Sequence, residues 1–257
     1  MIDLHCHILP GVDDGPTSQD ESLAMARRAV EDGVHTILAT PHTLNGIYIN
    51  PVTAVTSKVA ALKETLSKNH IKLQLYAGAD VHVCPHMLEM IERGEACTIK
   101  DARKYILLEF PSQTIPQGIK NEIFSLKLNG ITPIISHPER NAVIQQDLDI
   151  LYELVRMGAL SQLAASSITG YFGTKAMHCA ERLLKHRMVH VIASDAHSST
   201  IRPPVLSRAV EAAAEIMGSC EDPLRMVTDV PASILSGGMP DIPEPIPAKR
   251  GYGYRMN

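Results

Sequence analysis

Several features of common protein classes are missing from this 257-residue sequence, and each absence argues against one class of function. No apolar run approaches the roughly 18 residues that a membrane-spanning helix needs. Segment 1–15 is polar and acidic, unlike a signal peptide, so we expect a cytoplasmic protein without direct membrane insertion. The net charge of −4 gives no electrostatic case for nucleic acid, whose binders usually carry a basic patch or stripe.

The cysteines form no recognisable framework. There are five, an odd number, and the sequence has no Cys-x-x-Cys pair, which favours reduced thiols over disulfides. Cys97 and Arg103 match the Cys-x5-Arg spacing of cysteine-dependent phosphatases. The segment between them contains no glycine, whereas a phosphate-binding loop needs small residues so that successive N–H groups can surround the anion. We therefore interpret Cys97 as structural.

Short apolar runs alternate with amphipathic stretches along the chain. Strands are predicted at 1–5, 36–40, 72–77, 105–110, 132–136, 159–163 and 190–194, and helices at 18–32, 52–68, 117–129, 147–157, 174–185 and 204–217. Ser18 and Glu21 are typical of a capping box, and Gly33, Gly130 and Gly158 are placed to end helices. Seven βα units in series predict parallel strands. We expect an α/β fold, a closed or nearly closed seven-stranded barrel, with an open doubly wound sheet as the alternative.

The C-terminal end differs in composition from the rest. No linker or repeat interrupts residues 1–238, which we expect to form one barrel domain. Residues 239–257 form a proline-rich tail in which 240–247 predicts extended, polyproline-like chain and 249–255 combines basic and aromatic residues. A solvated tail is favoured over a segment that docks on a partner or a neighbouring subunit.

Histidine is abundant, with twelve residues, and several lie where predicted strands end. Six strand ends deliver His, Asp or Glu: His5 and His7, His42, Asp80, Glu109, His137, and Asp195 with His197. Asp14 lies in the loop after the first strand, although Asp13 and Asp14 would ordinarily be turn residues beside glycine. Barrels of this kind gather functional residues at the carboxyl ends of their strands. A single His-x-His is weak evidence, but coincidence is a poor explanation for six strand ends.

This ligand set predicts a metal centre. Glu109 and Asp195 end apolar strands, where an unpaired carboxylate is costly to bury, and a metal ion supplies the compensating charge. Nitrogen and oxygen ligands without thiolates suit Mn, Fe, Co or Zn, with Mg as a further option. Cys6 points to the opposite face of its strand and is interpreted as packing. Arg140 and Arg202 offer forked donors to phosphate oxygens, so we expect a phosphate ester as substrate.

The motifs that carry these residues resemble those of the bacterial protein-tyrosine phosphatases of the polymerase and histidinol phosphatase (PHP) superfamily, which are associated with capsule and exopolysaccharide loci. They are IDLHCHILPGVDDGP at 2–16, ATPH at 39–42, HPERN at 137–141, and SDAH at 194–197 with Arg202. The match covers residues 1 to about 235. It implies a distorted (β/α)7 barrel and three divalent metal ions, with Mn²⁺ as the first candidate.

The resemblance also implies a role for each site residue. His5, His7, Asp80 and Asp195 would hold one metal, Asp80, Glu109 and His137 the second, and Asp14, His42 and His197 the third. Arg140 and Arg202 match phosphate-binding arginines, and either His42 or His197 is a candidate to protonate the leaving group. Two positions depart from the family pattern: Asp80 replaces a usual Glu, and Thr43 replaces a frequent His.

The shorter side chain at position 80 requires a shifted backbone or a different spacing between the metals. His82 would face the same way if the strand continues, although a surface position is the simpler interpretation. The expected reaction is hydrolysis of a phosphate monoester by water activated between metals.

The implied substrate is a tyrosine-phosphorylated bacterial tyrosine kinase that controls capsular or exopolysaccharide synthesis and export. A small-molecule phosphatase such as histidinol phosphatase is one alternative, and a weakly active PHP module that binds a protein is another. The predicted helix 18–32 is a candidate homo-oligomer interface, but an ordinary barrel-packing helix has the same pattern.

Overall fold

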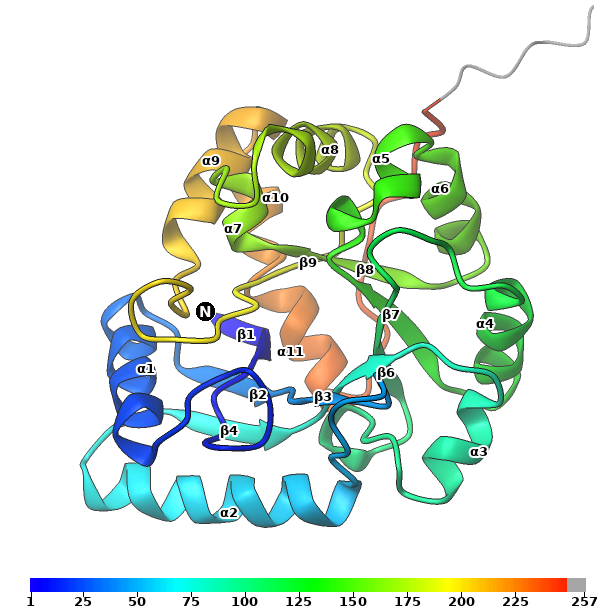
Figure 1. The fold of residues 1–257 in the computed structure, drawn as a ribbon. Coiled ribbons are helices and arrows are strands. Elements are labelled where there is room, and N and C mark those ends of the chain that lie inside the picture. Colours follow the sequence, from blue (N-terminus) through cyan, green and yellow to red (C-terminus); the bar gives the residue numbers. More distant parts are fainter. Residues whose placement is uncertain (249–257) are drawn as a thin grey trace, which may run out of the picture.

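Parallel strands form the centre of the computed structural model, which describes residues 1–248 (Figure 1). The strands are β1 (Ile2–Cys6), β2 (Thr36–Ala39), β3 (His42–Thr43), β4 (Gln74–Ala77), β5 (Asp80–His82), β6 (Tyr105–Glu109), β7 (Thr132–Ser136), β8 (Leu160–Ala164) and β9 (Val191–Ala193). One sheet has the order β1-β2-β4 and the other β3-β5-β6-β7-β8-β9, with every pairing parallel. The predicted α/β fold with parallel strands is confirmed.

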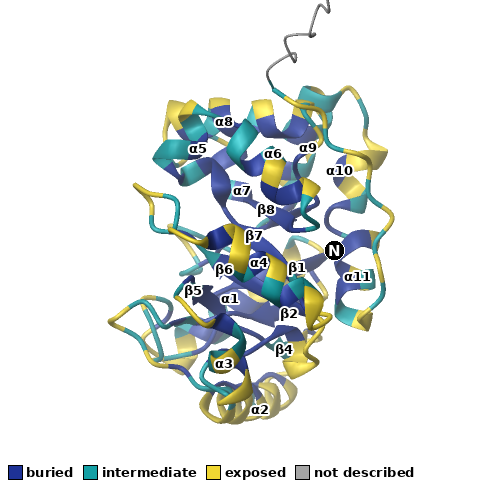
Figure 2. Ribbon diagram, turned by 90° about the vertical axis from the view of Figure 1, so that its right-hand side faces the viewer, coloured by how far each residue is buried: buried dark blue, intermediate teal, exposed yellow. Residues whose placement is uncertain are grey.

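Helices surround the strands, and their buried sides face them (Figure 2). They are α1 (Gln19–Glu31), α2 (Val52–Lys68), α3 (Met87–Glu92), α4 (Ile119–Leu128), α5 (Ala142–Gln146), α6 (Asp149–Arg156), α7 (Ala165–Ile168), α8 (Thr174–Lys185), α9 (Ser207–Met217), α10 (Glu221–Arg225) and α11 (Asp229–Ser236), with 3-10 turns η1 (Ile99–Asp101) and η2 (Pro138–Arg140). The six predicted helices are confirmed within a few residues. The helices α3, α5, α7 and α10 were not predicted, because segments of four to six residues show no clear periodicity. Helix α11 was also not predicted, although it has eight residues, as many as α6.

Two of the seven predicted strands are each followed by a short strand that was not predicted. Strand β3 follows β2 after Thr40 and Pro41, and β5 follows β4 after Gly78 and Ala79. Pro41 has no N–H to donate to a neighbouring strand, and the Thr40 hydroxyl accepts from Cys6 N at 3.0 Å. At Gly78, a Cβ would lie 3.0 Å from the Leu38 side chain. At both breaks the chain passes from one sheet to the other, which joins the two sheets.

The first and last strands also approach each other at their carboxyl ends. Cys6 forms an isolated parallel bridge with Ala196, just beyond β9. Asp195 N donates to His5 O at 2.8 Å, and His7 N donates to Ala196 O at 2.9 Å. Backbone hydrogen bonds therefore bring residues 5–7 and 195–196 side by side.

Successive residues of the strands alternate between two environments. Outward side chains such as Ile37, Ile106 and Ile135 belong to a large core packed against the helices. Inward side chains form a second cluster, which includes Ile2, Leu4, Leu38, Tyr105, Leu107, Ile134, Leu160, Val191 and Ala193. Helix α11 adds Val230 and Ile234 to this inward cluster, and Figure 1 shows it lying across the middle of the strands. The amino-terminal half of the inward face is thus apolar.

Residues 239–248 have no regular secondary structure and contact the body at several points. Ile246 N donates to His186 O at 2.8 Å, and Ala248 N donates to an Asp149 carboxylate oxygen at 3.0 Å. The predicted basic and aromatic segment 249–255 lies outside the described residues. No helix within residues 1–248 is long and apolar enough to cross a membrane.

Candidate metal centre

The inward rows of the strands change from apolar to polar at their carboxyl ends. Two residues beyond Leu107 comes Glu109, and two residues beyond Ala193 comes Asp195. Because side chains two apart share a face, each apolar row ends in a group that can bind a metal. The sequence periodicity therefore accounts for the direction of these carboxylates.

A bulge in β1 turns His5 and His7 to the inward face of the sheet. The register shifts between Asp3 and Cys6, so that β1 has one extra residue opposite β2. Leu4 consequently belongs to the inward cluster, whereas Cys6 belongs to the outer core. His5 and His7 then point inward, and the interpretation of Cys6 as packing is confirmed. The bulge itself was not predicted.

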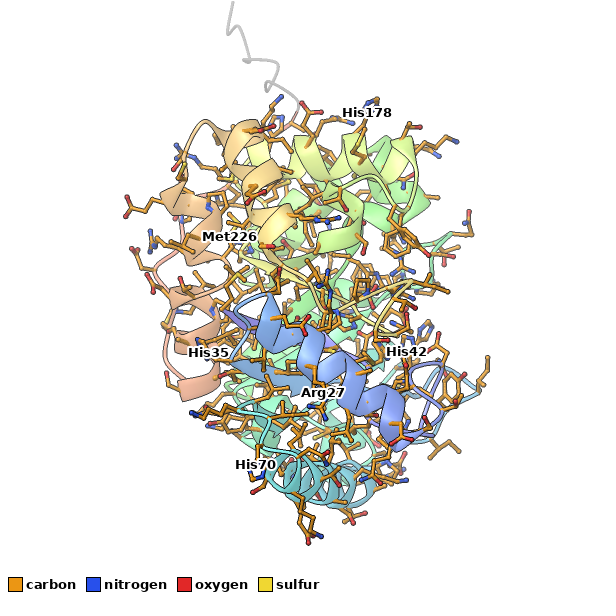
Figure 3. All side chains as sticks on the ribbon, turned by 90° about the vertical axis from the view of Figure 1, so that its left-hand side faces the viewer. Arg27, His35, His42, His70, His178 and Met226 are labelled. Atoms are coloured by element: carbon orange, nitrogen blue, oxygen red, sulfur yellow. The ribbon has the colours of Figure 1, made fainter. Side chains whose placement is uncertain are left out.

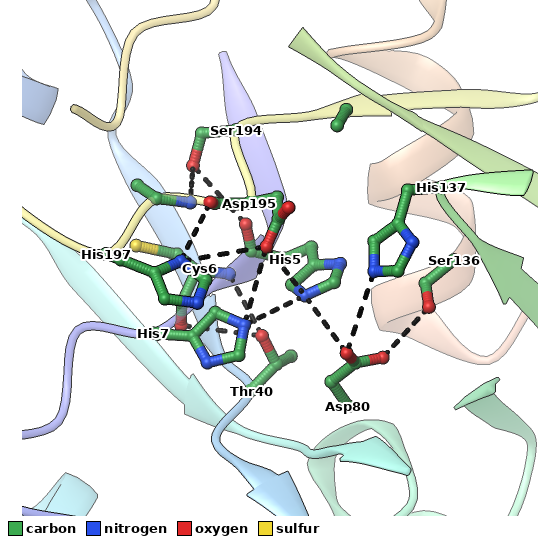
Figure 4. A network of polar contacts seen from close by, with 12 residues as sticks. His5, Cys6, His7, Thr40, Asp80, Ser136, His137, Ser194, Asp195 and His197 are labelled. Carbon is green, nitrogen blue, oxygen red and sulfur yellow. Dashed lines mark hydrogen bonds and ion pairs between the residues drawn. The ribbon is translucent and has the colours of Figure 1, made fainter. Parts of the chain in front are cut away.

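Predicted ligands from several strands converge at this end of the fold, and Figure 4 shows His5, His7, Asp80, His137, Asp195 and His197. His5 Nε2 lies 3.1 Å from His7 Nε2, 3.6 Å from Asp80 Oδ2 and 3.5 Å from Asp195 Oδ1. On the neighbouring strands, His137 Nε2 lies 3.9 Å from Asp80 Oδ2. His5, His7, Asp80 and Asp195 are at most 2% exposed. Donor atoms this close and this buried form a pocket that fits a cation.

A second part of the site surrounds Glu109. His137 Nε2 lies 3.7 Å from Glu109 Oε1, and His42 Nδ1 lies 3.5 Å from Glu109 Oε2 and 3.2 Å from Asp80 Oδ2. His82 Nδ1 approaches the same Glu109 oxygen at 3.6 Å, and its side chain is 28% exposed. The expectation that His82 shares a direction with Asp80 is therefore met, although it stays partly at the surface.

A third group lies around Asp14. Its Oδ1 is 3.6 Å from His42 Nε2 and 3.3 Å from His197 Nε2. The rings of His7 and His197 pack at 3.9 Å between centroids. Within residues 1–248, four sets of donor atoms each lie within 4.8 Å of one another, and together they include all nine predicted ligands: His7, Asp14, His42 and His197; His5, His7 and Asp80; His5, His137 and Asp195; and His42, Asp80 and Glu109.

Hydrogen bonds fix the orientation of three imidazoles. His5 Nδ1 donates to Gln162 Oε1 at 2.9 Å, and His7 Nδ1 donates to Asp13 Oδ2 at 2.6 Å. His197 Nδ1 donates to the Asp195 carbonyl oxygen at 3.0 Å. With Nδ1 hydrogen-bonded to these acceptors, Nε2 of each ring faces the site, and Nε2 is the atom that can bind a metal.

Four buried atoms of the site have no hydrogen-bond partner. They are Asp80 Oδ2, His42 Nδ1, His82 Nδ1 and Arg202 Nε. Such unsatisfied groups are costly in a protein interior unless they bind something else. Together with the imidazole orientations, they show that these residues fit a divalent metal ion.

The charges of the site also favour a cation. Burial lowers the pKa of His7, but hydrogen bonds and charges from Asp13 and Asp195 outweigh it and raise the pKa to about 10. Burial raises the pKa of Asp80, yet the neighbouring histidines, His5 first, hold it far below its usual value. Asp80 thus stays ionised, and His7 is protonated until a bound metal ion displaces the proton on its Nε2.

The two predicted arginines meet at one carboxylate. Arg140 Nη1 donates to Asp195 Oδ2 at 2.7 Å, and Arg202 Nη2 donates to the same oxygen at 2.6 Å. Arg202 Nε is buried without a hydrogen-bond partner. Arg140 also lines a cavity of about 280 Å³, together with His82, Glu109 and His137. Both arginines therefore lie beside the predicted metal ligands, with Asp195 as their shared acceptor.

Backbone conformation at two ligands is unusual. His137 has φ 33° and Asp195 has φ 51°, in the left-handed region that residues other than glycine rarely adopt. Both follow the last residues of parallel strands, β7 and β9. Strain of this kind gathers at functional sites, where side chains must be directed to a common point.

Several supporting residues were missed by the sequence analysis. Asp13 was interpreted as a turn residue, but it accepts from His7 and from His42 N. Gln162 was not singled out, although a polar residue within an apolar predicted strand was an available signal. Ser136 donates to Asp80 Oδ1 at 3.0 Å. These contacts hold ligands in place rather than supply them.

Other candidate groups lie elsewhere. Figure 3 shows His35, His70 and His178 on parts of the molecule away from His42. Cys97 is buried, and burial raises the pKa of its thiol to about 12, which agrees with a structural role.

Comparisons with known proteins agree with this geometry. Residues 1–236 match the family described as capsular polysaccharide synthesis, CpsB/CapC. The chain belongs to the CpsB/CapC family. It is 39% identical over 202 residues to the tyrosine-protein phosphatase YwqE from Bacillus subtilis (strain 168), with 79% of each chain covered. It is 32% identical over 224 residues to the tyrosine-protein phosphatase CpsB from Streptococcus pneumoniae, covering 85% of this chain and 92% of that protein.

Solved structures extend the similarity to the fold of the CpsB/CapC chain. A structure from the work on YwqE from Bacillus subtilis and CpsB from Streptococcus pneumoniae, described as unique metal-dependent tyrosine phosphatases, matches with a TM-score of 0.92 at 36% identity, covering 97% of this chain and 100% of that one. The β-aspartyl dipeptidase from Fervidobacterium islandicum AW-1 matches with a TM-score of 0.58 at 13% identity, covering 96% of this chain and 77% of that one, a similarity of fold alone. The predicted relationship to tyrosine phosphatases of capsule loci is confirmed.

Proposed function

We propose that this protein is a metal-dependent tyrosine-protein phosphatase of capsular or exopolysaccharide synthesis. The observation that carries the proposal is the convergence of nine His, Asp and Glu side chains with Arg140 and Arg202. The relatives named tyrosine-protein phosphatase support the substrate class. A buried cation site beside paired arginines is suited to phosphate monoesters, because both parts neutralise phosphoryl oxygens.

In this proposal three divalent ions bind, with Mn²⁺ the first candidate and Fe, Co, Zn or Mg as alternatives. The ligand sets are His5, His7, Asp80 and Asp195; Asp80, Glu109 and His137; and Asp14, His42 and His197. The Asp80 side chain is shorter than the glutamate expected from the resemblance. Its Oδ2 nevertheless lies within 4 Å of His5, His42 and His137, which supports a shared ligand.

When bound, the metal ions supply an activated water and electrostatic stabilisation of the phosphoryl group. The chain's residues supply position and charge. Gln162 and Asp13 hold His5 and His7 in the orientation that ligation needs. Arg140 and Arg202 direct N–H donors to phosphoryl oxygens. His42 or His197 is the candidate proton donor to the leaving phenolate, provided that the ring concerned is not bound to a metal ion. A phenol, with a pKa near 10, needs little help to leave.

The proposed architecture is a distorted seven-stranded barrel in which β2 with β3, and β4 with β5, each count as one strand. The hydrogen bonds between residues 5–7 and 195–196 support closure. Residues 1–238 form the barrel domain, and 239–257 form the tail.

The proposed substrate is a tyrosine-phosphorylated bacterial tyrosine kinase that controls polysaccharide synthesis and export, and the enzyme acts in the cytoplasm. Assembly into a homo-oligomer is part of the same proposal. The match to the capsular polysaccharide synthesis family supports the process, since phosphotyrosine phosphatases need a kinase that makes their substrate.

The test compares hydrolysis of a phosphotyrosine peptide and of histidinol phosphate, with Mn²⁺ and after chelation. We expect preference for the peptide, loss of activity with chelator, and loss in Arg140→Ala. Arg156→Ala is the matched control, because Arg156 is exposed on α6 and pairs with Glu244 away from the site. Preference for histidinol phosphate would contradict the proposed substrate and favour a small-molecule phosphatase. Metal binding without turnover of either compound would favour a protein that binds a partner and has no phosphatase activity.

A further inference from the structure

One aromatic side chain contacts both arginines of the site. The ring centroid of Phe172 lies 4.4 Å from Arg140 Cζ and 5.3 Å from Arg202 Cζ. Both distances fall within the roughly 6 Å over which a guanidinium is attracted to an aromatic face. Phe172 lies between α7 and α8, far in sequence from both arginines, and no strand-end pattern marks it.

The contact leaves the hydrogen-bonding edges of the arginines available. A guanidinium stacks through its planar face and donates through its edge. The edges of Arg140 and Arg202 reach Asp195 Oδ2, and Arg202 Nε has no hydrogen-bond partner. If Asp195 binds a cation, it becomes a weaker acceptor for the arginines, whereas the contacts with the ring are unaffected. The ring can therefore hold both arginines while their edges turn to another acceptor.

The backbone around Phe172 is a defined turn. Gly170 and Gly173 flank Tyr171 and Phe172, and both glycines have φ 86°, which side-chain-bearing residues rarely adopt. Gly173 N donates to Gly170 O at 3.0 Å, and Tyr171 N donates to Ser166 O at 2.9 Å. The two rings pack edge to face at 5.2 Å, with Tyr171 54% exposed and Phe172 half-buried. Two glycines and two hydrogen bonds thus fix the place of the aromatic ring.

We propose that Phe172 is a positioning residue, which holds Arg140 and Arg202 with their N–H edges directed to the phosphoryl group. This inference rests on the proposed function, because it takes the two arginines as the phosphate-binding groups. Phe172 acts through the arginines and is assigned no contact with the reacting atoms.

The experiment measures binding of inorganic phosphate to the Mn²⁺-loaded protein by isothermal titration calorimetry. Phe172→Leu keeps an apolar side chain but removes the aromatic face, and we expect phosphate to bind about 3- to 30-fold more weakly. Phe172→Tyr keeps the ring and should restore affinity to within about twofold. Phe124→Leu is the matched control, since it makes the same change at a 60% exposed position on α4, and its affinity should equal that of the wild type.

Wild-type affinity in Phe172→Leu, or an equal loss in Phe124→Leu, would overturn the proposal. So would a failure of phosphate to bind the metal-loaded wild type. Melting curves of the metal-loaded variants identify a folding defect, and Phe172→Tyr supplies the folded comparison in that case. Turnover of a phosphotyrosine peptide tests the proposed function separately: phosphate binding without peptide hydrolysis would reject that function, while the comparison of Leu and Tyr at position 172 still decides the role of the ring.

Discussion

The two halves of the inward strand face have opposite chemistry. Towards the amino ends, Leu107 and Val191 pack in an apolar cluster closed by α11. Towards the carboxyl ends, His5, Asp80 and Asp195 are equally buried but polar. Burial of charge is tolerated only where partners or a cation compensate, so the second half depends on what it binds and the first does not. We therefore expect the apolar amino ends of the strands to determine stability and the polar carboxyl ends to determine function. Four substitutions test that expectation.

The largest expected effect comes from Asp195→Asn at the polar end. This change removes a charge that faces three histidines and both arginines, so we expect kcat/KM to fall roughly 1000-fold. Steady-state kinetics and metal analysis of the purified protein provide the measurements. Asp20→Asn, at an exposed position on α1, is the control and should change little. Near-normal metal content and activity in Asp195→Asn would remove the functional distinction between the two halves.

Leu107→Ala tests the apolar end. Leu107 is 1% exposed, and its truncation should lower the free energy of unfolding by about 3 kcal/mol through lost burial and a cavity. Urea denaturation measures the change, with Leu128→Ala at a 71% exposed site as the control, expected within about 0.5 kcal/mol of the wild type. The folded variant should keep its metal affinity. Loss of metal affinity without loss of stability would contradict the assignment of stability to the apolar half and of metal binding to the polar half.

His190, beside the amino end of β9, tests whether buried titratable groups outside the metal centre also set stability. Burial lowers the pKa of His190 to about 4, and its Nδ1 accepts from Ser161 N at 3.0 Å. Because the folded-state pKa is below the ordinary value near 6.5, the stabilisation is fully present above about pH 6.5 and is lost as pH falls through that value towards about 4. Arg187, Asp222, Arg225 and Asp241 line the adjoining cavity.

In His190→Asn the amide oxygen can replace the Nδ1 acceptor without titrating. The difference in free energy of unfolding between variant and wild type should therefore shift in favour of the variant by about 2 kcal/mol between pH 7 and pH 4.5. Denaturation at both pH values provides the measurement. A difference that does not depend on pH would show that His190 does not titrate as a buried neutral group.

Gln162→Leu extends the apolar half by one layer, and its expected effect is the smallest. The substitution removes the acceptor of His5 Nδ1 and should weaken metal binding about 10-fold, since residues that orient a ligand tune its affinity. Competition with a metal-sensitive dye measures the affinity, and Gln74→Leu at an exposed position on β4 is the control. Unchanged metal affinity in Gln162→Leu would show that Gln162 does not contribute to the polar, metal-binding half.

Much of the site could be predicted because strand periodicity and strand ends are local properties. The predicted ligands, such as His5, Asp80 and Asp195, follow apolar runs in the sequence, and parallel strands bring such positions to one end. The supporting residues Asp13 and Phe172 carry no comparable local signal, and Gln162 carries only its polarity within an apolar predicted strand. Their roles depend on side chains that approach from distant segments.

The same division holds for the fold. The sequence by itself determined the parallel α/β arrangement, the six predicted helices and the strand ends that carry the predicted ligands. Each of these follows from a repeat of two or about 3.6 residues. Only the tertiary structure decided the bulge in β1, the breaks at Pro41 and Gly78, and the first residue of α9. That helix was predicted from Pro204 but begins at Ser207, where Asp32 of the first helical segment accepts from Leu206 N and Ser207 N. Such contacts join residues far apart in the chain, and a local pattern holds no information about which distant group will satisfy an N–H or face a ring.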